Sequence, residues 1–420
     1  LLLPLVAPGL SLNYTDYQVR GDYRADDHVS FSIFFFGSDD HLDQSGQLMG
    51  GVASAGTQTA FGYDFQRVIG RVRLRLPHRI QVSIAGMLGR DGNSFSSSQP
   101  GSDPLQIALQ NSRAGLRVDA EIPWADWTRT QLGLDIDATN FQVDASIFVP
   151  PGLGEYEQPL FSPTGNIPIQ RAVPRALGAV YVDQIFTFGP LELSAALRLD
   201  YNRYGDVSQV YPDPRAVTRW QVVPELVLKA ATGLFSQQPV AFQLTREGGN
   251  PALQPTRAWQ SSGGFELTLP ERIEVHSTFF YSAMFNLTEQ RTRVVPSPEG
   301  PRRVFFTDDG EGRAYGLELL VRRRIERGLY GWLSYTLSRS ERLTSSGRWQ
   351  SFVFDQTHTL NLALSYSIDG WRFGVAFQLS TGRPNDTLVS TRFDSEGAEY
   401  DPGFRREGER LPTFHRLDIR

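Results

Sequence analysis

The residues best suited to chemistry in this sequence lack the spacing of a functional site. Asp308, Asp309 and Glu311 crowd one segment and could offer carboxylates to Ca²⁺, but they do not follow the spacing of a calcium-binding loop. A solvated acidic loop is the simpler interpretation. His276 and His358 have no partner ligand at i+2 or i+4, the spacings at which a second zinc ligand would be expected. We therefore expect no metal site.

Catalysis and cofactor binding are equally poorly supported. Ser98, His78 and Asp64 form no hydrolase motif, and the absence of cysteine excludes a thiol nucleophile, a disulfide framework and Cys-ligated zinc. The chain carries 41 basic and 46 acidic residues, and the net charge of −5 argues against a nucleic-acid partner. The sequence thus predicts no catalytic residue, no cofactor and no enzyme.

The charged residues instead alternate with apolar ones. From Asp16 to Arg24, Asp, Gln and Arg occupy one set of alternate positions, and Tyr17, Val19 and Tyr23 lie in the other set. Successive side chains of a strand point to opposite faces, so the segment has one polar and one apolar surface. We expect roughly 17 such strands and no helix. Clear examples occur at 67–76, 80–84, 113–121, 131–137, 191–200, 359–368 and 371–379.

The connections between these strands alternate in length. Short turns are expected at 25–27, 77–78, 123–126, 189–190, 223–224, 270–271, 325–328 and 369–370. Long polar loops are expected at 37–63, 90–105, 147–170, 205–216, 236–256, 290–310, 342–356 and 384–411. Short turns at one end and long loops at the other are typical of transmembrane β-barrels, whose apolar face meets lipid. A soluble propeller fits less well, because strands of about 9–12 residues exceed the usual ~5–6 and no 40–50-residue repeat is visible.

The polar set of positions would then face the barrel lumen. Two interpretations remain open for it: a hydrated interior crossed by ion pairs, or a contact surface for a plug domain. The basic residues concerned are Arg20, Arg67, Arg71, Arg73, Arg113, Arg117 and Arg198, and the acidic ones are Asp16, Asp22, Asp119, Glu121, Asp135, Asp137, Glu192 and Asp200.

Other polar and aromatic residues also have two interpretations. The charged segment 392–410 is expected to be solvated surface rather than a binding site. Aromatic residues near strand ends fit interfacial girdles better than a ligand site. These are Tyr201, Tyr204, Trp220, Trp259, Tyr335 and Trp371.

Short segments of the second half occur in the order known from one receptor family. They are 250–256 (NPALQPT), 312–319 (GRAYGLEL), 329–340 (LYGWLSYTLSRS), 354–361 (FDQTHTLN), 382–384 (GRP) and 415–418 (HRLD). Together they resemble the barrel of TonB-dependent outer-membrane receptors, although Thr256 stands where that family usually has Glu. Residues 1–210 match only as a generic barrel.

The resemblance implies an all-β, large antiparallel up-and-down transmembrane barrel of 22 strands. We interpret 1–420 as one partial barrel domain, cut at both ends, without a plug domain or the last strands. The implied function is outer-membrane import of a scarce solute, such as an iron chelate, vitamin or glycan, with energy from a TonB-type protein acting through the plug. The expected partners are outer-membrane lipid, the plug, the TonB-type protein and a small molecule. A passive porin or a structural, adhesive barrel remains the alternative, and the substrate is not readable.

Overall fold

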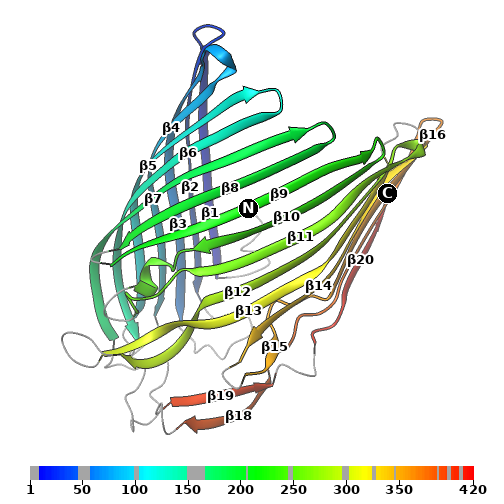
Figure 1. Ribbon diagram of the computed structural model, residues 1–420. Coiled ribbons are helices and arrows are strands. Elements are labelled where there is room, and N and C mark those ends of the chain that lie inside the picture. The colour runs from blue at the N-terminus through cyan, green and yellow to red at the C-terminus, as the bar shows by residue number, and fades with distance from the viewer. Residues whose placement is uncertain are drawn as a thin grey trace. The chain divides into compact units, whose positions relative to one another are not determined.

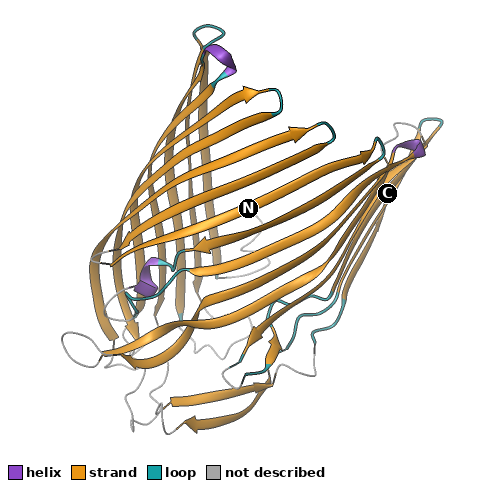
Figure 2. Ribbon diagram, viewed as in Figure 1, coloured by secondary structure: helices purple, strands orange, loops and turns teal. Residues whose placement is uncertain are grey.

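The computed structural model describes residues 9–45, 57–98, 104–148, 166–204, 207–244, 249–295, 302–323, 328–344, 347–385, 387–394, 399–405 and 410–420 (Figure 1). Nearly all of them lie in strands (Figure 2). The strands are β1 (Leu10–Arg24), β2 (Val29–Ser45), β3 (Gln58–Arg75), β4 (Gln81–Ser98), β5 (Leu105–Ala125), β6 (Thr128–Phe148), β7 (Asn166–Phe188), β8 (Leu191–Tyr204), β9 (Val207–Val223), β10 (Leu226–Gln237), β11 (Thr256–Leu269), β12 (Ile273–Val295), β13 (Arg302–Arg323), β14 (Gly328–Leu343), β15 (Trp349–Ser351), β16 (His358–Ile368), β17 (Trp371–Ser380), β18 (Thr387–Asp394), β19 (Glu399–Arg405) and β20 (Phe414–Ile419).

The strands follow an antiparallel up-and-down order, as predicted. Among the described residues, β1–β17 and β20 form one sheet of 18 strands, one more than expected, and β18 and β19 pair only with each other. The helical elements are short 3₁₀ turns: η1 (Pro77–Arg79), η2 (Ala241–Leu244) and η3 (Pro270–Arg272). Within the described residues, no helix has the length and hydrophobicity needed to cross a membrane.

The chain forms two compact units. The first comprises Leu1–Trp124, Thr130–Val182 and Arg198–Tyr211, and the second comprises Ala125–Arg129, Asp183–Leu197 and Pro212–Arg420. Most of β1–β7 belongs to the first unit, and β10–β20 belong to the second.

In the first unit, cross-strand pairing confirms the predicted alternation. Residues directly opposed in neighbouring strands share a face. One such row contains only apolar residues: Val19, Phe35, Val68, Leu88 and Ala114. We call its side of the sheet the outer face, because a membrane barrel turns its apolar band outward. The inner face carries the opposite row of Asp22, Ser32, Arg71, Ala85 and Arg117.

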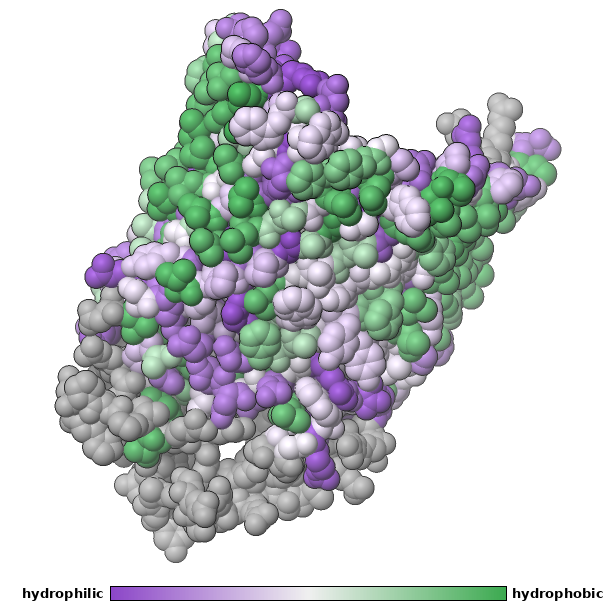
Figure 3. All heavy atoms as spheres, viewed as in Figure 1, coloured by the Kyte–Doolittle hydropathy of each residue, from purple (hydrophilic) through white to green (hydrophobic). Residues whose placement is uncertain are grey.

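The second unit has an apolar band of its own, and we call that side of its sheet its outer face. One row crosses eight strands without a polar residue: Leu226, Leu267, Val275, Val321, Leu333, Leu362, Phe377 and Leu417. The neighbouring inner row is mostly polar and includes Glu266, His276, Ser334, Asn361, Gln378 and Arg416. In the first unit, Figure 3 shows hydrophobic residues along the strands next to η1, at the top of the view. The η1 turn itself is hydrophilic.

The turns at the end of the strands that carries η1 are as short as predicted. At η1, His78 and Arg79 adopt positive φ angles of 61° and 62°, which lets the chain reverse within three residues. In the β1–β2 turn, Asp26 accepts hydrogen bonds from the backbone N–H groups of His28 (2.6 Å) and Val29 (2.8 Å). These donors favour the ionised carboxylate and lower the pKa of Asp26. The expected turn at 325–328 lies mostly outside the described residues.

Several predicted loops are wrong, because the strands run further than expected. Strand pairing covers much of 37–63, 205–216 and 290–310, and 384–411 contains the β18–β19 hairpin. Spanning a membrane takes only about 9–11 residues of a strand. Strands such as β5, with 21 residues, therefore extend beyond it at the end away from η1.

The face preference reverses in this extension of the first unit. Asp39 and Asp64 pair on the outer face, whereas Leu42 and Phe61 pair on the inner face. A sequence search for apolar residues that stay on one face along a whole strand therefore does not assign these residues to strands. The prediction for 236–256 holds, since β10 ends at Gln237 and β11 begins at Thr256.

Candidate functional site

The inner face of the first unit carries a chain of ion pairs next to the short turns. Arg117 Nε lies 3.0 Å from Asp119, and Arg198 Nη1 lies 2.7 Å from Asp135. Arg198 Nε also binds Asp200 at 2.9 Å, and Tyr181 donates a 2.5 Å hydrogen bond to Asp119. These residues come from β5, β6, β7 and β8.

The structure thus brings together many of the charged residues predicted for the lumen. Arg20–Asp22 and Arg113–Asp137 add two further pairs, at 2.8 Å and 2.5 Å. A cavity of about 450 Å³ lies over Arg73, Arg117 and Glu121. The positive and negative charges alternate closely, so this surface suits water or a partner that is itself mixed in charge.

Further from the turns, the same inner face becomes apolar. One row crosses five strands and contains Leu12, Leu42, Phe61, Phe95 and Ile107, which we call the apolar patch. The rings of Phe61 and Phe95 lie 4.9 Å apart. A groove of about 430 Å³ runs over the apolar patch.

The apolar patch is accessible. Phe61 is 44% exposed and Leu12 is 53% exposed, and the neighbouring Tyr63 is 43% exposed. The sequence analysis missed this surface, because Leu42, Phe61 and Phe95 fall in segments interpreted as loops. The available signal was the alternation around Phe61 and Tyr63. It has the two-residue period of a strand, but its apolar residues occupy the inward-facing positions rather than the outward-facing ones.

The acidic segment proposed as an alternative calcium site has other partners. Asp308 accepts the backbone N–H of Gln254 at 2.8 Å, and Asp309 accepts the hydroxyl of Thr307 at 2.6 Å. Within the part of the chain that the structure describes, no three His, Asp or Glu side chains are grouped as metal ligands.

The remaining candidates for chemistry are not brought together. Asp64 pairs with Gly92 and Ser98 pairs with Gln58, whereas His78 lies in the turn at the opposite end of these strands.

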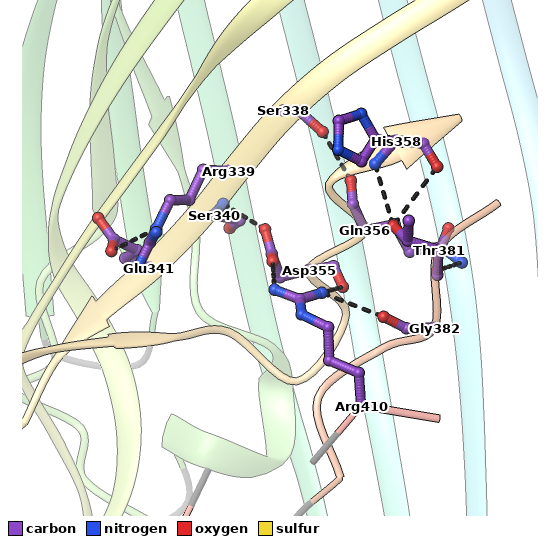
Figure 4. Close-up of polar contacts among 10 residues, drawn as sticks. All are labelled: Ser338, Arg339, Ser340, Glu341, Asp355, Gln356, His358, Thr381, Gly382 and Arg410. Atoms are coloured by element: carbon purple, nitrogen blue, oxygen red, sulfur yellow. Dashed lines mark hydrogen bonds and ion pairs between the residues drawn. The ribbon is translucent and has the colours of Figure 1, made fainter. Parts of the chain in front are cut away.

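A buried polar cluster joins four segments of the second unit (Figure 4). The side chain of Asp355 is 1% exposed and accepts the backbone N–H of Ser340 at 2.7 Å. Arg410 donates Nη2 to Asp355 Oδ2 at 2.5 Å and Nη1 to the carbonyl of Gly382 at 3.1 Å. We call Ser340, Asp355, Gly382 and Arg410 the clamp. It connects β14 to three other segments: the one before β16, the one after β17 and the one before β20.

The clamp explains the motif at 354–361. Next to Asp355, the carbonyl of Gln356 accepts the Ser338 hydroxyl at 3.0 Å, and the N–H of His358 is donated to Thr381 Oγ1 at 3.0 Å (Figure 4). The sequence analysis expected the segment 392–410 to be solvated surface. Arg410 is exposed, as that prediction has it, but its guanidinium also reaches the buried Asp355. The structure describes no side chain elsewhere in that segment.

The motif at 250–256 also packs into the fold. Leu253 is 1% exposed, and the Asn250 side-chain amide donates to the carbonyl of Phe306 at 3.1 Å. Thr256, which replaces the family's usual Glu, donates its hydroxyl to the carbonyl of Asn286 at 3.1 Å. Both motifs therefore hold strands together at the long-loop end.

Most of the proposed girdle residues are exposed, as a membrane interface requires. Tyr201, Trp220 and Trp259 are 41–45% exposed, and Trp371 is 70% exposed. The prediction is wrong for Tyr204, which is 6% exposed. Tyr204 shares the face of Arg198 and Asp200 because it lies an even number of residues along β8.

These features define a transmembrane β-barrel of the outer-membrane type. A family model described as "TonB dependent receptor-like, beta-barrel" matches residues 7–420, and the chain belongs to this family. It is therefore an outer-membrane barrel of a Gram-negative bacterium, with its outer face against lipid. No curated protein matches the chain.

Solved structures agree on the fold at low identity. The ferripyoverdine receptor of Pseudomonas aeruginosa is 10% identical, with a TM-score of 0.70, and the match covers 98% of this chain and 59% of that one. The ferric yersiniabactin uptake receptor FyuA of Yersinia pestis is 11% identical, with a TM-score of 0.69 and coverage of 97% and 62%. The ferric-catecholate import receptor Fiu of E. coli is 12% identical, with a TM-score of 0.66 and coverage of 98% and 68%. The chain spans about 60% of the length of the first matched structures.

The orientation of the barrel can be tested by labelling. Single cysteines are introduced at Ser96, in the extension of β4, and at His78, in η1, of the full-length receptor. These 420 residues contain no cysteine, and any cysteine elsewhere in the receptor is replaced by serine first. An impermeant maleimide applied to intact cells should label the Ser96→Cys variant and leave His78→Cys unlabelled until the outer membrane is permeabilised. Labelling of His78→Cys alone would reverse the orientation.

Proposed function

We propose that the protein imports a small amphiphilic solute, such as a metal chelate, across the outer membrane. The energy would come from a TonB-type protein acting through a plug domain in the full-length receptor. Transport, rather than catalysis, is the activity. Family membership supports the proposal, and the names of the matched structures describe receptors for iron chelates.

The apolar patch is the observation that carries this proposal. It lies on the inner face at the long-loop end, where a solute arriving from outside first meets the barrel wall. Water-exposed aromatic rings such as Phe61 are costly unless something covers them, and a ligand with an apolar part would do so. Asp40 and Asn93 beside the patch offer polar groups that could orient such a ligand.

The ion pairs near the short turns suit a plug domain, which is another of the expected partners. A plug must contact the wall yet move when it is pulled, so its interface should be hydrated and polar rather than tightly apolar. The Arg117–Asp119 and Arg198–Asp135 pairs give the wall such a surface. In the alternative interpretation, the same ion pairs cross a water-filled interior and contact no plug.

The proposal is tested by uptake and binding in the full-length receptor. Phe61→Ala and Phe95→Ala should each weaken binding of the transported solute by about tenfold or more, since burying one aromatic side chain is worth about 1.5–3 kcal/mol. Gln110→Ala is the control, because Gln110 lies on the outer face of the same extension.

The energy source is tested in the same cells. Uptake should stop when the proton gradient is collapsed, and a plug deletion should leave a nonspecific ion conductance. Uptake that continues without the gradient would identify a passive porin. Surface adhesion without any uptake defect in a deletion strain would identify a structural barrel.

A further inference from the structure

A row of aromatic rings continues from the apolar patch into the membrane-spanning part of the first unit. On the inner face, its members are Phe34 and Phe36 of β2 and Tyr63 and Phe65 of β3, which we call the aromatic track. The ring centroids lie 4.6 Å apart for Phe34 and Phe36, 5.7 Å for Phe36 and Phe65, and 5.9 Å for Phe65 and Tyr63. These distances are typical of interacting aromatic side chains, so the track is a continuous apolar surface.

The aromatic track connects two depths of the barrel wall. At its upper end, Tyr63 follows Phe61 of the apolar patch by two residues, so both side chains lie on the inner face. At its lower end, Phe34 precedes Phe35, which belongs to the apolar row of the outer face. From Phe34 to Leu42, which lies opposite Phe61, the strand is about 27 Å long. The rings therefore give an apolar group a path from the apolar patch to the depth of the hydrocarbon.

The aromatic track is narrow, because polar residues border it on both sides. Gln18 of β1 lies opposite Phe36, and Asp91 of β4 lies opposite Phe65. Permanent contacts between domains bury broad apolar surfaces, whereas this stripe is confined to two strands. The ion pairs near the short turns already supply the polar, hydrated wall that a moving plug requires. The stripe therefore suits a small guest better than a protein domain.

Arg67 lies beside the rings and is directed away from β2. Its Nη1 donates to the backbone carbonyl of Arg90 at 2.9 Å, and its guanidinium pairs with Asp91, so the side chain extends along the wall toward β4. Gly89 leaves room for it, because a Cβ atom there would lie 2.6 Å from Arg67. Phe36 is consequently only half-buried, and its ring remains accessible from the lumen.

We propose that the aromatic track is a second binding position for the transported solute, and that this solute carries an aromatic ring. The proposal rests on the import function proposed above. The solute first contacts the apolar patch, and its ring then stacks on Phe65 and Phe36 as it moves along β3 and β2. Successive rings are 4.6–5.9 Å apart, so the ring of the solute meets the next contact before it has lost the last one.

The test attaches small groups beside the track in a full-length receptor without other cysteines. Gln18 is replaced by cysteine, because it is exposed on the inner face of β1 and lies opposite Phe36. The variant is equilibrated by disulfide exchange with equal amounts of benzyl mercaptan and 2-mercaptoethanol. Intact-mass spectrometry then measures the ratio of the two mixed disulfides. Both groups form the same bond to the protein, so a raised benzyl share reports binding of the ring to the track.

Ala85→Cys is the matched control for the position. Ala85 lies on the same inner face near the short turns, and its direct cross-strand neighbours are the charged Arg71 and Arg117. The ratio of benzyl to hydroxyethyl disulfide should be about fivefold higher at Gln18→Cys than at Ala85→Cys, as expected for one aromatic contact.

A second substitution identifies the ring that binds. Adding Phe36→Ala to Gln18→Cys should remove the benzyl excess. Adding Phe35→Ala should leave it unchanged, because Phe35 is the adjacent ring of β2 and lies on the outer face. Folding of every variant is checked by the faster gel migration of the unheated barrel.

Any of three results would overturn the proposal. Equal ratios at Gln18→Cys and Ala85→Cys in the folded receptor would show that the plug or another part of the chain covers the rings. A benzyl excess that survives Phe36→Ala would place the bound ring elsewhere. An equal excess with cyclohexylmethanethiol would assign the track to any apolar group.

The exchange is measured on purified receptor and does not depend on uptake. A receptor that shows the benzyl excess but imports no solute would refute the import function and leave the ring-binding site in place. A receptor that imports a solute but shows no excess would refute the aromatic track alone.

Discussion

Arg410→Met should lower the free energy of unfolding by about 3–5 kcal/mol, as expected when a buried carboxylate loses its counter-charge. The reason is the asymmetry of the clamp. The Asp355 side chain is 1% exposed and that of Arg410 is 37% exposed, so removing the arginine leaves a carboxylate in the interior without its counter-charge. The measurement is denaturant unfolding of the full-length receptor in lipid vesicles.

Companion variants identify the cause of this loss. Asp355→Asn should cost less, about 1–2 kcal/mol, because an amide oxygen can still accept the Ser340 N–H and no buried charge remains. Adding Asp355→Asn to Arg410→Met should therefore recover stability. If the double variant is instead less stable than Arg410→Met alone, the buried charge is not what makes the clamp sensitive.

Leu362→Arg should destabilise the barrel by about 2–4 kcal/mol, the cost of an arginine at mid-membrane on a lipid-facing position. Leu362 lies in the eight-strand apolar row, between Leu333 of β14 and Phe377 of β17. The guanidinium would have to enter hydrocarbon or distort the bilayer to reach water. Folding yield and unfolding free energy in vesicles of defined thickness measure this cost.

The adjacent residue provides the control. Asn361 lies between Ser334 and Gln378 on the inner face, so Asn361→Arg adds a charge to a hydrated surface and should change stability little. Equal losses for Leu362→Arg and Asn361→Arg would show that the two residues do not differ in their exposure to lipid, and the assigned register of β16 would be wrong.

The membrane-spanning part of the fold was predictable because lipid imposes one rule on every strand. From Asp16 to Arg24 the alternation gave the correct faces, and the short turns at 77–78 and 270–271 were found where η1 and η3 lie. Beyond the membrane the rule no longer applies. Water reaches both faces there, so Asp64 can point outward and Phe61 inward, and the same residues were interpreted as loop.

Only one side of the clamp could be predicted from the sequence. The motif at 354–361 marks Asp355, but its partner Arg410 lies 55 residues later, beyond the β18–β19 hairpin, in a segment rich in exposed-looking charges. Composition cannot show which arginine of a charged segment binds a buried carboxylate. The apolar patch was missed for a related reason, since its five members come from five strands.

The unbroken row from Leu226 to Leu417 has a consequence for how such chains can change in length during evolution. Deleting one residue within β16 would carry every following side chain of that strand to the other face, so its leucines would enter the lumen and its polar residues would enter lipid. Deleting two residues keeps the faces and shortens the strand by one repeat. Gains and losses of residues inside the spanning strands should therefore come in pairs, whereas the loops outside the membrane can change by any number.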